Sequence, residues 1–97
     1  MPVEGQIRRI FKNDSKMALA ISQAENGRRD CTRTHKNNNG SVDVGIFQLN
    51  SVHEAKGNRF DCTENIKIAK QIFDRQGWSP WVVYQTGAYK KFLNLYE

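Results

Sequence analysis

Apolar residues recur at helical spacing from the start of the chain. Residues 4–12 place apolar side chains at positions i, i+3 and i+4, which form one face of a short amphipathic helix: Ile7, Ile10 and Phe11. Asn13-Asp14 interrupts this pattern. We therefore expect a first helix that ends near residue 12.

The second helix is apolar around most of its circumference. Asp14 or Ser15 can cap its start, it runs to about Asn26, and Gly27 can end it in the left-handed position that glycine favours. Its side chains are mostly apolar or small: Met17, Ala18, Leu19, Ala20, Ile21 and Ala24. A helix with no polar face is buried, so this is the predicted central helix of the fold.

Glu25 lies in the last turn of that helix. The negative end of the helix dipole and poor solvation both disfavour a charge there, so its pKa should rise. A carboxyl group that stays protonated near neutral pH can act as a general acid. The plainer interpretation is a surface carboxylate at a frayed helix end.

The periodicity changes to that of a strand after the second helix. Residues 32–36 are the expected partner strand of a hairpin, and Asn39-Gly40 fits a two-residue type I′ turn. Val42 and Val44 alternate with Asp43, so the Asp43 carboxylate faces the opposite side of its strand. Gln48 and Asn50 follow with amides that can hydrogen-bond to a sugar or to the backbone, and Gln48 could equally brace the hairpin. Glu25 and Asp43, two acids in different surroundings, are the candidate catalytic residues.

The rest of the chain returns to helical patterns. Residues 51–54 read as a capping box that opens a short helix stopped by Gly57. Thr63 can cap the next helix, which Gly77 ends, and its core face consists of Ile66, Ala69, Ile72 and Phe73.

Two shorter helical segments are expected at the end. Ser79-Pro80 supplies an N-cap and a first-turn proline for a helix through residues 81–84, and Gly87 breaks it. Residues 88–96 form a last amphipathic segment. The pattern as a whole predicts one domain over residues 1–97, of the α+β class but mostly α, with a central buried helix and one small antiparallel β-hairpin.

Charge narrows the classes of partner. The chain carries a net charge of +5 with a pI near 9.5, which favours an anionic polymer or surface. Its basic residues are spread out, and it has no helix-turn-helix, zinc-ligand or RNA-binding motif, so we expect no nucleic-acid partner. No run approaches the roughly 20 apolar residues of a membrane span. The N-terminus has no charged-then-apolar signal pattern, so we expect that the chain either stays inside the cell until it is released or is exported by a segment outside this sequence.

Cys31 and Cys62 are the only cysteines. Neither belongs to a CxxC motif or stands beside a histidine, and three alternatives remain open: a disulfide, two buried thiols or a reactive thiol. A disulfide would imply an oxidising compartment. His35 and His53 are expected in solvent, so we expect neither a metal site nor a cofactor.

The stretch from Asn39 to Ser51 closely resembles the hairpin segment of animal-type (c-type) lysozymes. In that family an Asp, a Gly-aliphatic-hydrophobic-Gln run and an Asn-Ser pair recur in this order, here as Asp43, residues 45–48 and Asn50-Ser51. Residues 20–27 resemble the end of the catalytic helix in the wider superfamily, which includes the soluble lytic transglycosylases. The usual Glu-Ser-Gly or Glu-Ser-Asn is Glu-Asn-Gly here.

The later helices extend the resemblance. Residues 65–73 are similar to the long central helix of these proteins, and residues 80–87 resemble both the tryptophan helix of c-type lysozymes and the Tyr-Asn-Ala-Gly motif of the transglycosylases. The chain departs from the pattern too. It is shorter, could form one disulfide where c-type enzymes have four, and has Val44 for their usual Tyr and Gln85 for the transglycosylase Asn.

The resemblance implies a lysozyme-like fold and a hydrolase that cuts peptidoglycan between N-acetylmuramic acid and N-acetylglucosamine. Glu25 looks like the general acid and Asp43 like the second carboxylate. The implied substrate contacts are Gln48, Asn50, Trp81, Tyr84 and Gln85, with Trp81 also packing against Glu25. The resemblance further implies a monomer that is secreted, periplasmic or bound to the cell wall.

Rival functions remain. A lytic transglycosylase would use Glu25 alone as acid and then base and would release 1,6-anhydro sugars. A cell-wall-binding module without catalysis and a basic nucleic-acid binder are the alternatives outside the enzymes.

Overall fold

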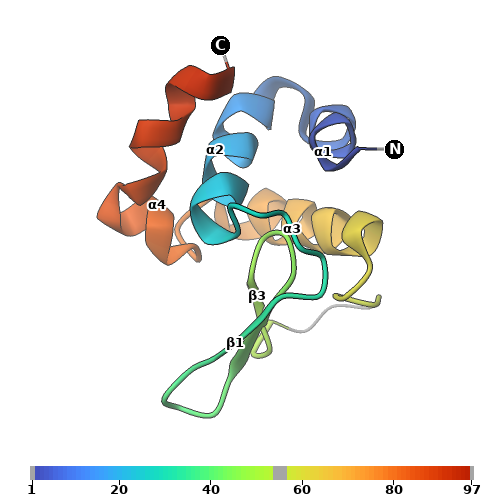
Figure 1. The fold of residues 1–97 in the computed structure, drawn as a ribbon, viewed down its shortest axis with the longest axis vertical. Coiled ribbons are helices and arrows are strands. Elements are labelled where there is room, and N and C mark those ends of the chain that lie inside the picture. The colour runs from blue at the N-terminus through green and yellow to red at the C-terminus, as the bar shows by residue number, and fades with distance from the viewer. Residues whose placement is uncertain (1, 54–56, 97) are drawn as a thin grey trace.

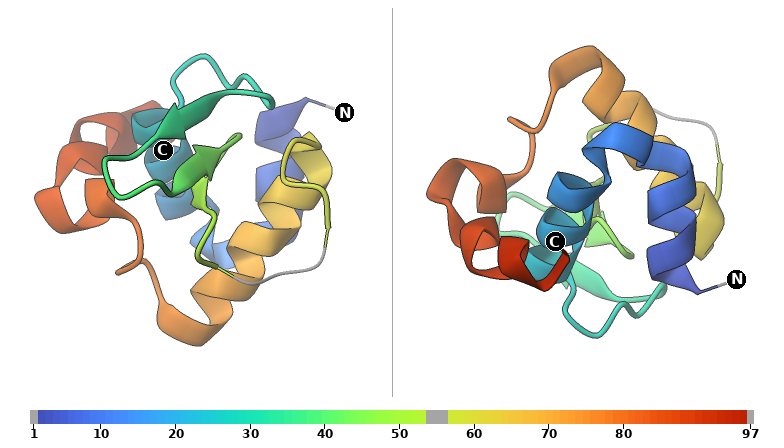
Figure 2. Two further views of the ribbon diagram at one scale, coloured as in Figure 1. Left: turned by 90° about the horizontal axis from the view of Figure 1, so that it is seen from below. Right: turned by 90° about the horizontal axis from the view of Figure 1, so that it is seen from above.

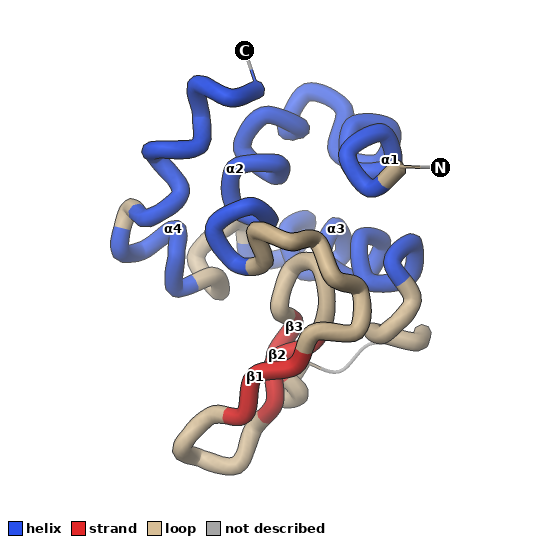
Figure 3. Tube along the Cα trace, in the orientation of Figure 1, coloured by secondary structure: helices blue, strands red, loops and turns tan. Residues whose placement is uncertain are grey.

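In a computed structural model, which describes residues 2–53 and 57–96, helices gather around one central helix and a small sheet projects from them (Figures 1 and 3). The elements, with η for a 3₁₀ helix, are α1 (Val3–Phe11), η1 (Lys12–Asp14), α2 (Ser15–Glu25), β1 (Thr34–Lys36), β2 (Val42–Val44), β3 (Leu49–Asn50), α3 (Cys62–Gln76), α4 (Val82–Thr86) and η2 (Ala88–Tyr96). The fold is α+β and mostly helical, which confirms the predicted class.

Helix α2 occupies the centre, as its composition predicted. Helices α1, α4 and η2 pack on it, and α3 packs on α1 (Figure 2). Its buried residues include Ala18, Leu19, Ala20, Ile21 and Ser22. The Ser22 hydroxyl donates a hydrogen bond to the Leu19 carbonyl at 2.9 Å, so even this polar side chain is satisfied inside the core.

Both ends of α2 differ from the prediction. Asn13-Asp14 lies in the 3₁₀ turn η1, which connects α1 to α2 without a non-helical break. Neither Asp14 nor Ser15 caps α2 with its side chain. The Ser15 hydroxyl donates instead to the Arg8 carbonyl at 3.2 Å.

The prediction that Gly27 adopts the left-handed conformation is wrong. Gly27 does not have a positive φ, whereas Arg29 has a φ of 53°. The buried side chain of Asn26 ends the helix in its place, since its Nδ2 donates to the carbonyls of Asp30 and Gly45.

The sheet has three antiparallel strands in the order β1-β2-β3, one more than predicted. The third strand is only two residues long, pairing Asp43 with Asn50 and Val44 with Leu49. A two-residue strand leaves too short an alternation for the sequence to reveal it.

The turn between β1 and β2 is also not of type I′. Gly40 has a φ of 87°, but Asn39 has no positive φ. The Gly40 N–H donates to the Asn37 carbonyl at 3.1 Å, and the Asn37 N–H donates to the Ser41 carbonyl at 2.8 Å. These bonds define a three-residue loop with glycine in its last position.

Helix α3 has the predicted core face, with Ile66, Ala69 and Ile72 buried and Gly77 at its end with a φ of 68°. Its N-cap is not Thr63 but Asp61, whose side chain accepts a hydrogen bond from the Glu64 N–H at 3.0 Å.

The segments on either side of α3 start differently from the prediction. Residues 51–53 form turns, and the Ser51 hydroxyl oxygen accepts from the Val42 N–H at 3.1 Å instead of capping a helix. The rest of that predicted helix falls on residues 54–56, outside the described residues. Helix α4 begins at Val82, after a turn that holds Ser79-Pro80, and the Ser79 hydroxyl donates to the Gln76 carbonyl.

Aromatic rings from α1, from the loop between β2 and β3 and from the stretch between α3 and α4 fill the core. Phe11 lies with its ring centroid 5.5 Å from those of both Phe47 and Trp78, and Trp78 lies 5.2 Å from Trp81. Cys31 and Cys62 form a disulfide, with Cα atoms 5.1 Å apart, that ties the loop after α2 to the start of α3. None of the helices among the described residues is long and apolar enough to cross a membrane.

Candidate active site

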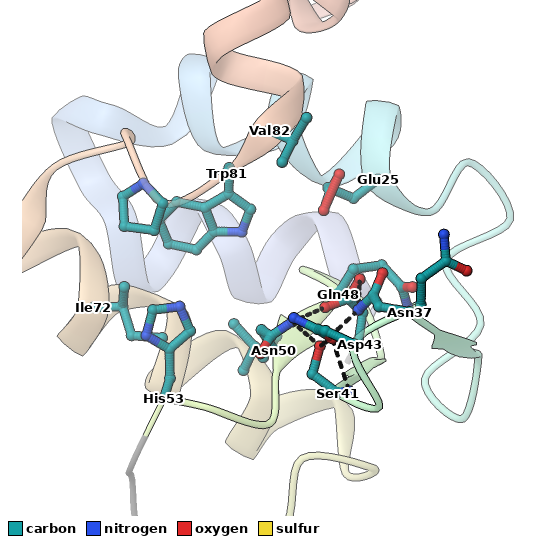
Figure 4. A pocket seen from close by; sticks show the side chains of 14 residues that line it. Glu25, Asn37, Ser41, Asp43, Gln48, Asn50, His53, Ile72, Trp81 and Val82 are labelled. Carbon is teal, nitrogen blue, oxygen red and sulfur yellow. Dashed lines mark hydrogen bonds between the residues drawn. The ribbon is translucent and has the colours of Figure 1, made fainter.

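The two acids singled out in the sequence line one cleft. It has a volume of about 430 Å³ and lies between the end of α2, the sheet and the start of α4 (Figure 4). Glu25 comes from the last turn of α2 and Asp43 from the middle of β2. Among residues 2–53 and 57–96, no three His, Cys, Asp or Glu side chains gather in a way that would hold a metal ion.

Glu25 is a half-buried carboxyl group with a pKa raised from its usual 4.5 to about 7. Burial is the largest cause, the negative charge of Asp43 adds to it, and the positive charge of Arg33 partly offsets both. The direction agrees with the prediction from its place at the end of a buried helix. Glu25 can therefore hold a proton at neutral pH and release it at little cost.

Asp43 is held by side-chain amides. Asn37 Nδ2 donates to one carboxylate oxygen at 3.2 Å and Asn50 Nδ2 donates to the other at 3.0 Å. Both amide nitrogens also donate to the Ser41 hydroxyl oxygen at 3.1 Å, and the Ser41 hydroxyl donates to Asn39 Oδ1 at 2.6 Å (Figure 4). The network fixes the orientation of the carboxylate before any ligand arrives.

A single carbonyl links the segments that carry the two acids. The carbonyl of Gly45 accepts hydrogen bonds from Asn26 Nδ2 at 3.1 Å and from Gln48 Nε2 at 2.8 Å. Asn26 follows Glu25 directly, and Gly45 stands two residues after Asp43. The buried Asn26 side chain therefore sets how the end of α2 meets the loop after β2.

Asn65 fixes the same loop from the other side. Fully buried on α3, it accepts from the Phe47 N–H at 3.0 Å and donates to the carbonyls of Val44 and Arg59, each at 2.9 Å. The side chain thus ties the loop after β2 and the turn before α3 to helix α3.

The predicted substrate contacts divide into two groups. Gln48, Asn50 and Trp81 line the cleft. Gln48 braces the loop through the carbonyls of Gly45 and Arg33, and Asn50 holds Asp43, so both amides already have structural partners. Trp81 is 4% exposed and its Nε1 donates to the Phe47 carbonyl at 3.0 Å. The Trp81 side chain therefore belongs to the core and also forms part of the cleft wall.

Tyr84 and Gln85 do not line the cleft. The Tyr84 ring stacks on that of Tyr89 with centroids 5.3 Å apart, and Gln85 Nε2 donates to the Ser79 carbonyl at 2.5 Å. Their role in substrate binding stays a prediction that this arrangement does not support.

Sequence reasoning missed several residues of the cleft. Ser41 stands two positions before Asp43, and this strand parity could have placed both on one side of the hairpin. His53, expected in solvent, is half-buried and lines the cleft beside Ile72 (Figure 4). No sequence signal marks His53, because its position depends on how the chain leaves β3.

Comparison with known proteins places most of the chain in one family. The family model described as a lysozyme-like domain matches residues 9–83, a stretch that contains both acids. Lysozyme P of Drosophila melanogaster is 32% identical over 82 residues, which cover 67% of this chain and 58% of that protein. Lysozyme c-1 of Anopheles gambiae is 37% identical over 62 residues, which cover 50% of this chain and 44% of that protein. The chain spans about half the length of these curated relatives.

Proposed function

Because this chain belongs to the family of lysozyme-like domains, we propose that it is a glycosidase that hydrolyses peptidoglycan. The bond cut is the β-1,4 linkage between N-acetylmuramic acid and N-acetylglucosamine. One observation carries the proposal: a carboxyl group with a pKa of about 7 and a carboxylate held by two amides line the same cleft.

The two carboxyl groups have different parts in the reaction. Glu25 donates its proton to the glycosidic oxygen as the bond to the sugar breaks, which requires an acid that is still protonated near pH 7. Asp43 faces the positive charge that develops on the sugar ring and stabilises it or attacks the anomeric carbon. Glu25, now ionised, then takes a proton from the attacking water.

The surroundings of Asp43 favour hydrolysis over transglycosylation. A lytic transglycosylase needs Glu25 alone, first as acid and then as base, and would make no demand on a second carboxylate. Here both oxygens of Asp43 receive an amide N–H, which keeps the group in one orientation. Such a fixed carboxylate is useful if it acts on the transition state.

Other properties of the chain suit a cell-wall substrate. The net charge of +5 favours approach to an anionic polymer. The disulfide fits an oxidising compartment, so we place the action of the protein outside the cytoplasm, as a secreted, periplasmic or wall-associated domain. Both acids lie in one copy of the chain, and a monomer is therefore sufficient.

The deciding experiment is mass spectrometry of the soluble products after incubation with purified peptidoglycan. We compare the unaltered protein with Glu25→Gln and Asp43→Asn. The matched control is Glu64→Gln, at a half-exposed glutamate on α3 that does not line the cleft. We expect products with a reducing muramic acid end. Loss of the acid should cost at least about 100-fold in rate, while Glu64→Gln should keep full activity.

The other outcomes are distinct. Products lighter by one water, with Asp43→Asn fully active, would make the protein a lytic transglycosylase. Binding to cell walls without soluble products from any variant would make it a binding module. If the protein shifted the electrophoretic mobility of an oligonucleotide at low salt and did not bind cell walls, it would be a nucleic-acid-binding protein.

A further inference from the structure

A hydrogen-bond network joins the last helix of the fold to the chain on both sides of Glu25. The Tyr96 hydroxyl, at the end of η2, accepts from Arg29 Nη2 at 2.7 Å and donates to Gln23 Oε1 at 3.2 Å. Gln23 Nε2 in turn donates to the Gly27 carbonyl at 3.3 Å. We call these four residues, Gln23, Gly27, Arg29 and Tyr96, the Tyr96 network.

The Tyr96 network lies behind the acid rather than in the cleft. Successive residues of an α-helix are about 100° apart around its axis, so Gln23 and Glu25 point to roughly opposite sides of α2. Glu25 lines the cleft, whereas Gln23 meets η2, which packs along α2 (Figures 1 and 2). None of the four residues lines the cleft.

Arg29 combines an uncommon backbone conformation with a largely buried side chain. Its φ of 53° lies in the left-handed region, which is unfavourable for a side chain of this size. The side chain is only 17% exposed, and its Nε is buried without a hydrogen-bond partner among the described residues. What holds the guanidinium group is the Tyr96 hydroxyl, the Tyr96 ring with its centroid 5.6 Å away, and Glu4 at 4.0 Å.

The end of α2 needs such support. Helix ends fray, because the last carbonyls have no partner in the helix. Asn26 anchors this end to Gly45 on the side of the sheet, and the Tyr96 network anchors it on the side of η2. Glu25 stands between the two anchors.

We propose that Tyr96 is a positioning residue for Glu25. By holding Gln23 before the acid and Arg29 after it, the Tyr96 hydroxyl fixes the last turn of α2 so that the carboxyl group stays in the cleft. The catalytic consequence rests on the proposed function, but the positioning of Glu25 does not.

Loss of the hydroxyl has a defined electrostatic effect. Burial is the largest cause of the raised pKa of Glu25, so a looser last turn admits water and lowers that pKa. The charged groups that act on Glu25 are Asp43 and Arg33, and neither belongs to the Tyr96 network. A fall in the pKa therefore reports a change at the helix end.

The test is the pair Tyr96→Phe and Tyr89→Phe. Each removes one hydroxyl group from η2 and keeps the ring. The Tyr89 hydroxyl has no hydrogen-bond partner among the described residues, and its ring stacks on Tyr84 and packs against the core. The pKa of Glu25 is measured by NMR titration of its carboxyl carbon. In parallel, kcat and KM are measured on purified peptidoglycan fragments at about pH 5 and pH 7.

We expect Tyr96→Phe to lower the pKa of Glu25 by about one unit and Tyr89→Phe to leave it unchanged. The protonated fraction at pH 7 then falls about fivefold, and kcat should fall with it at an unchanged KM. At pH 5 the acid is protonated in both proteins, so the difference should shrink to less than about twofold. A general loss of structure would lower kcat equally at both pH values.

An unchanged pKa of Glu25 in a folded Tyr96→Phe variant would overturn the proposal, and so would an equal loss at pH 5 and pH 7. If Tyr96→Phe does not fold, Gln23→Met removes the same link from α2 while keeping a good helix former, and the same fall is expected. If the unaltered protein has no glycosidase activity, the proposed function fails, whereas the NMR titration still decides the positioning role.

Discussion

Glu25 shows how much a single side chain depends on its surroundings. Its carboxyl group is half-buried at the end of the most buried helix and faces the negative charge of Asp43, and its pKa of about 7 leaves it about half protonated at neutral pH. Such a carboxyl group can act as a general acid, but it lowers the stability of the protein above its usual pKa. The folded state disfavours the negative charge, whereas the unfolded state ionises freely.

Replacing Glu25 should therefore stabilise the protein at high pH. Between its unfolded pKa of about 4.5 and its folded pKa of about 7, the folded state binds more protons, so the free energy of unfolding falls as pH rises. We expect Glu25→Gln to raise the free energy of unfolding by about 2–3 kcal/mol at pH 8 and by little at pH 4. Urea denaturation at the two pH values measures this, with Glu64→Gln as the control; an equal effect at both would contradict it.

At the scale of elements, the loop between β2 and β3 is the part that the cleft depends on most. It turns at Gly45, whose carbonyl gathers donors from Asn26 and Gln48, and it is held from α3 by Asn65. Gly45 has a φ of 80°, and a Cβ there would collide with Asn65 Nδ2 and stand 2.9 Å from the Arg59 carbonyl. Both the backbone and the packing therefore require glycine.

Gly45→Ala should destabilise the protein more than Gly77→Ala. Gly77 also has a positive φ, 68°, but a Cβ there meets nothing within 4 Å, so its variant reports backbone strain alone. The strained backbone alone should cost Gly77→Ala about 1–3 kcal/mol. We expect Gly45→Ala to lose at least about 2 kcal/mol more, because the collision adds to the strain. Equal losses in urea denaturation would mean that Asn65 yields to the new methyl group without cost.

At the scale of the molecule, the folded chain measures 37 × 28 × 26 Å along its principal axes. The cleft lies where the helices and the sheet meet. A small core gains stability from a covalent link, and the disulfide ties the loop after α2 to the start of α3. The same loop carries Arg29, so the link and the Tyr96 network hold neighbouring parts of one segment.

Removing the disulfide should cost several kcal/mol. Cys31 and Cys62 are 31 residues apart, and a closed loop of that length stabilises the fold by about 3–4 kcal/mol in the chain-entropy description. We expect the double variant Cys31→Ser, Cys62→Ser to have a free energy of unfolding lower by that amount, as measured by urea denaturation. Its stability should no longer depend on reducing agent. A loss below about 1 kcal/mol would show that the helices hold this loop without the link.

The sequence by itself determined the elements whose signal is local. The apolar circumference of α2, the core face of α3 and the alternation around Asp43 followed from side-chain periodicity. The raised pKa of Glu25 followed from its place in the last turn of a buried helix. The tertiary structure alone decided the rest. The third strand, the bonds of Asn26 and Asn65 to distant carbonyls, and the contact of Tyr96 with Arg29 join residues 5 to 67 positions apart in the chain. Asparagine and tyrosine side chains accept many partners, and only the folded chain determines which donors and acceptors come within reach.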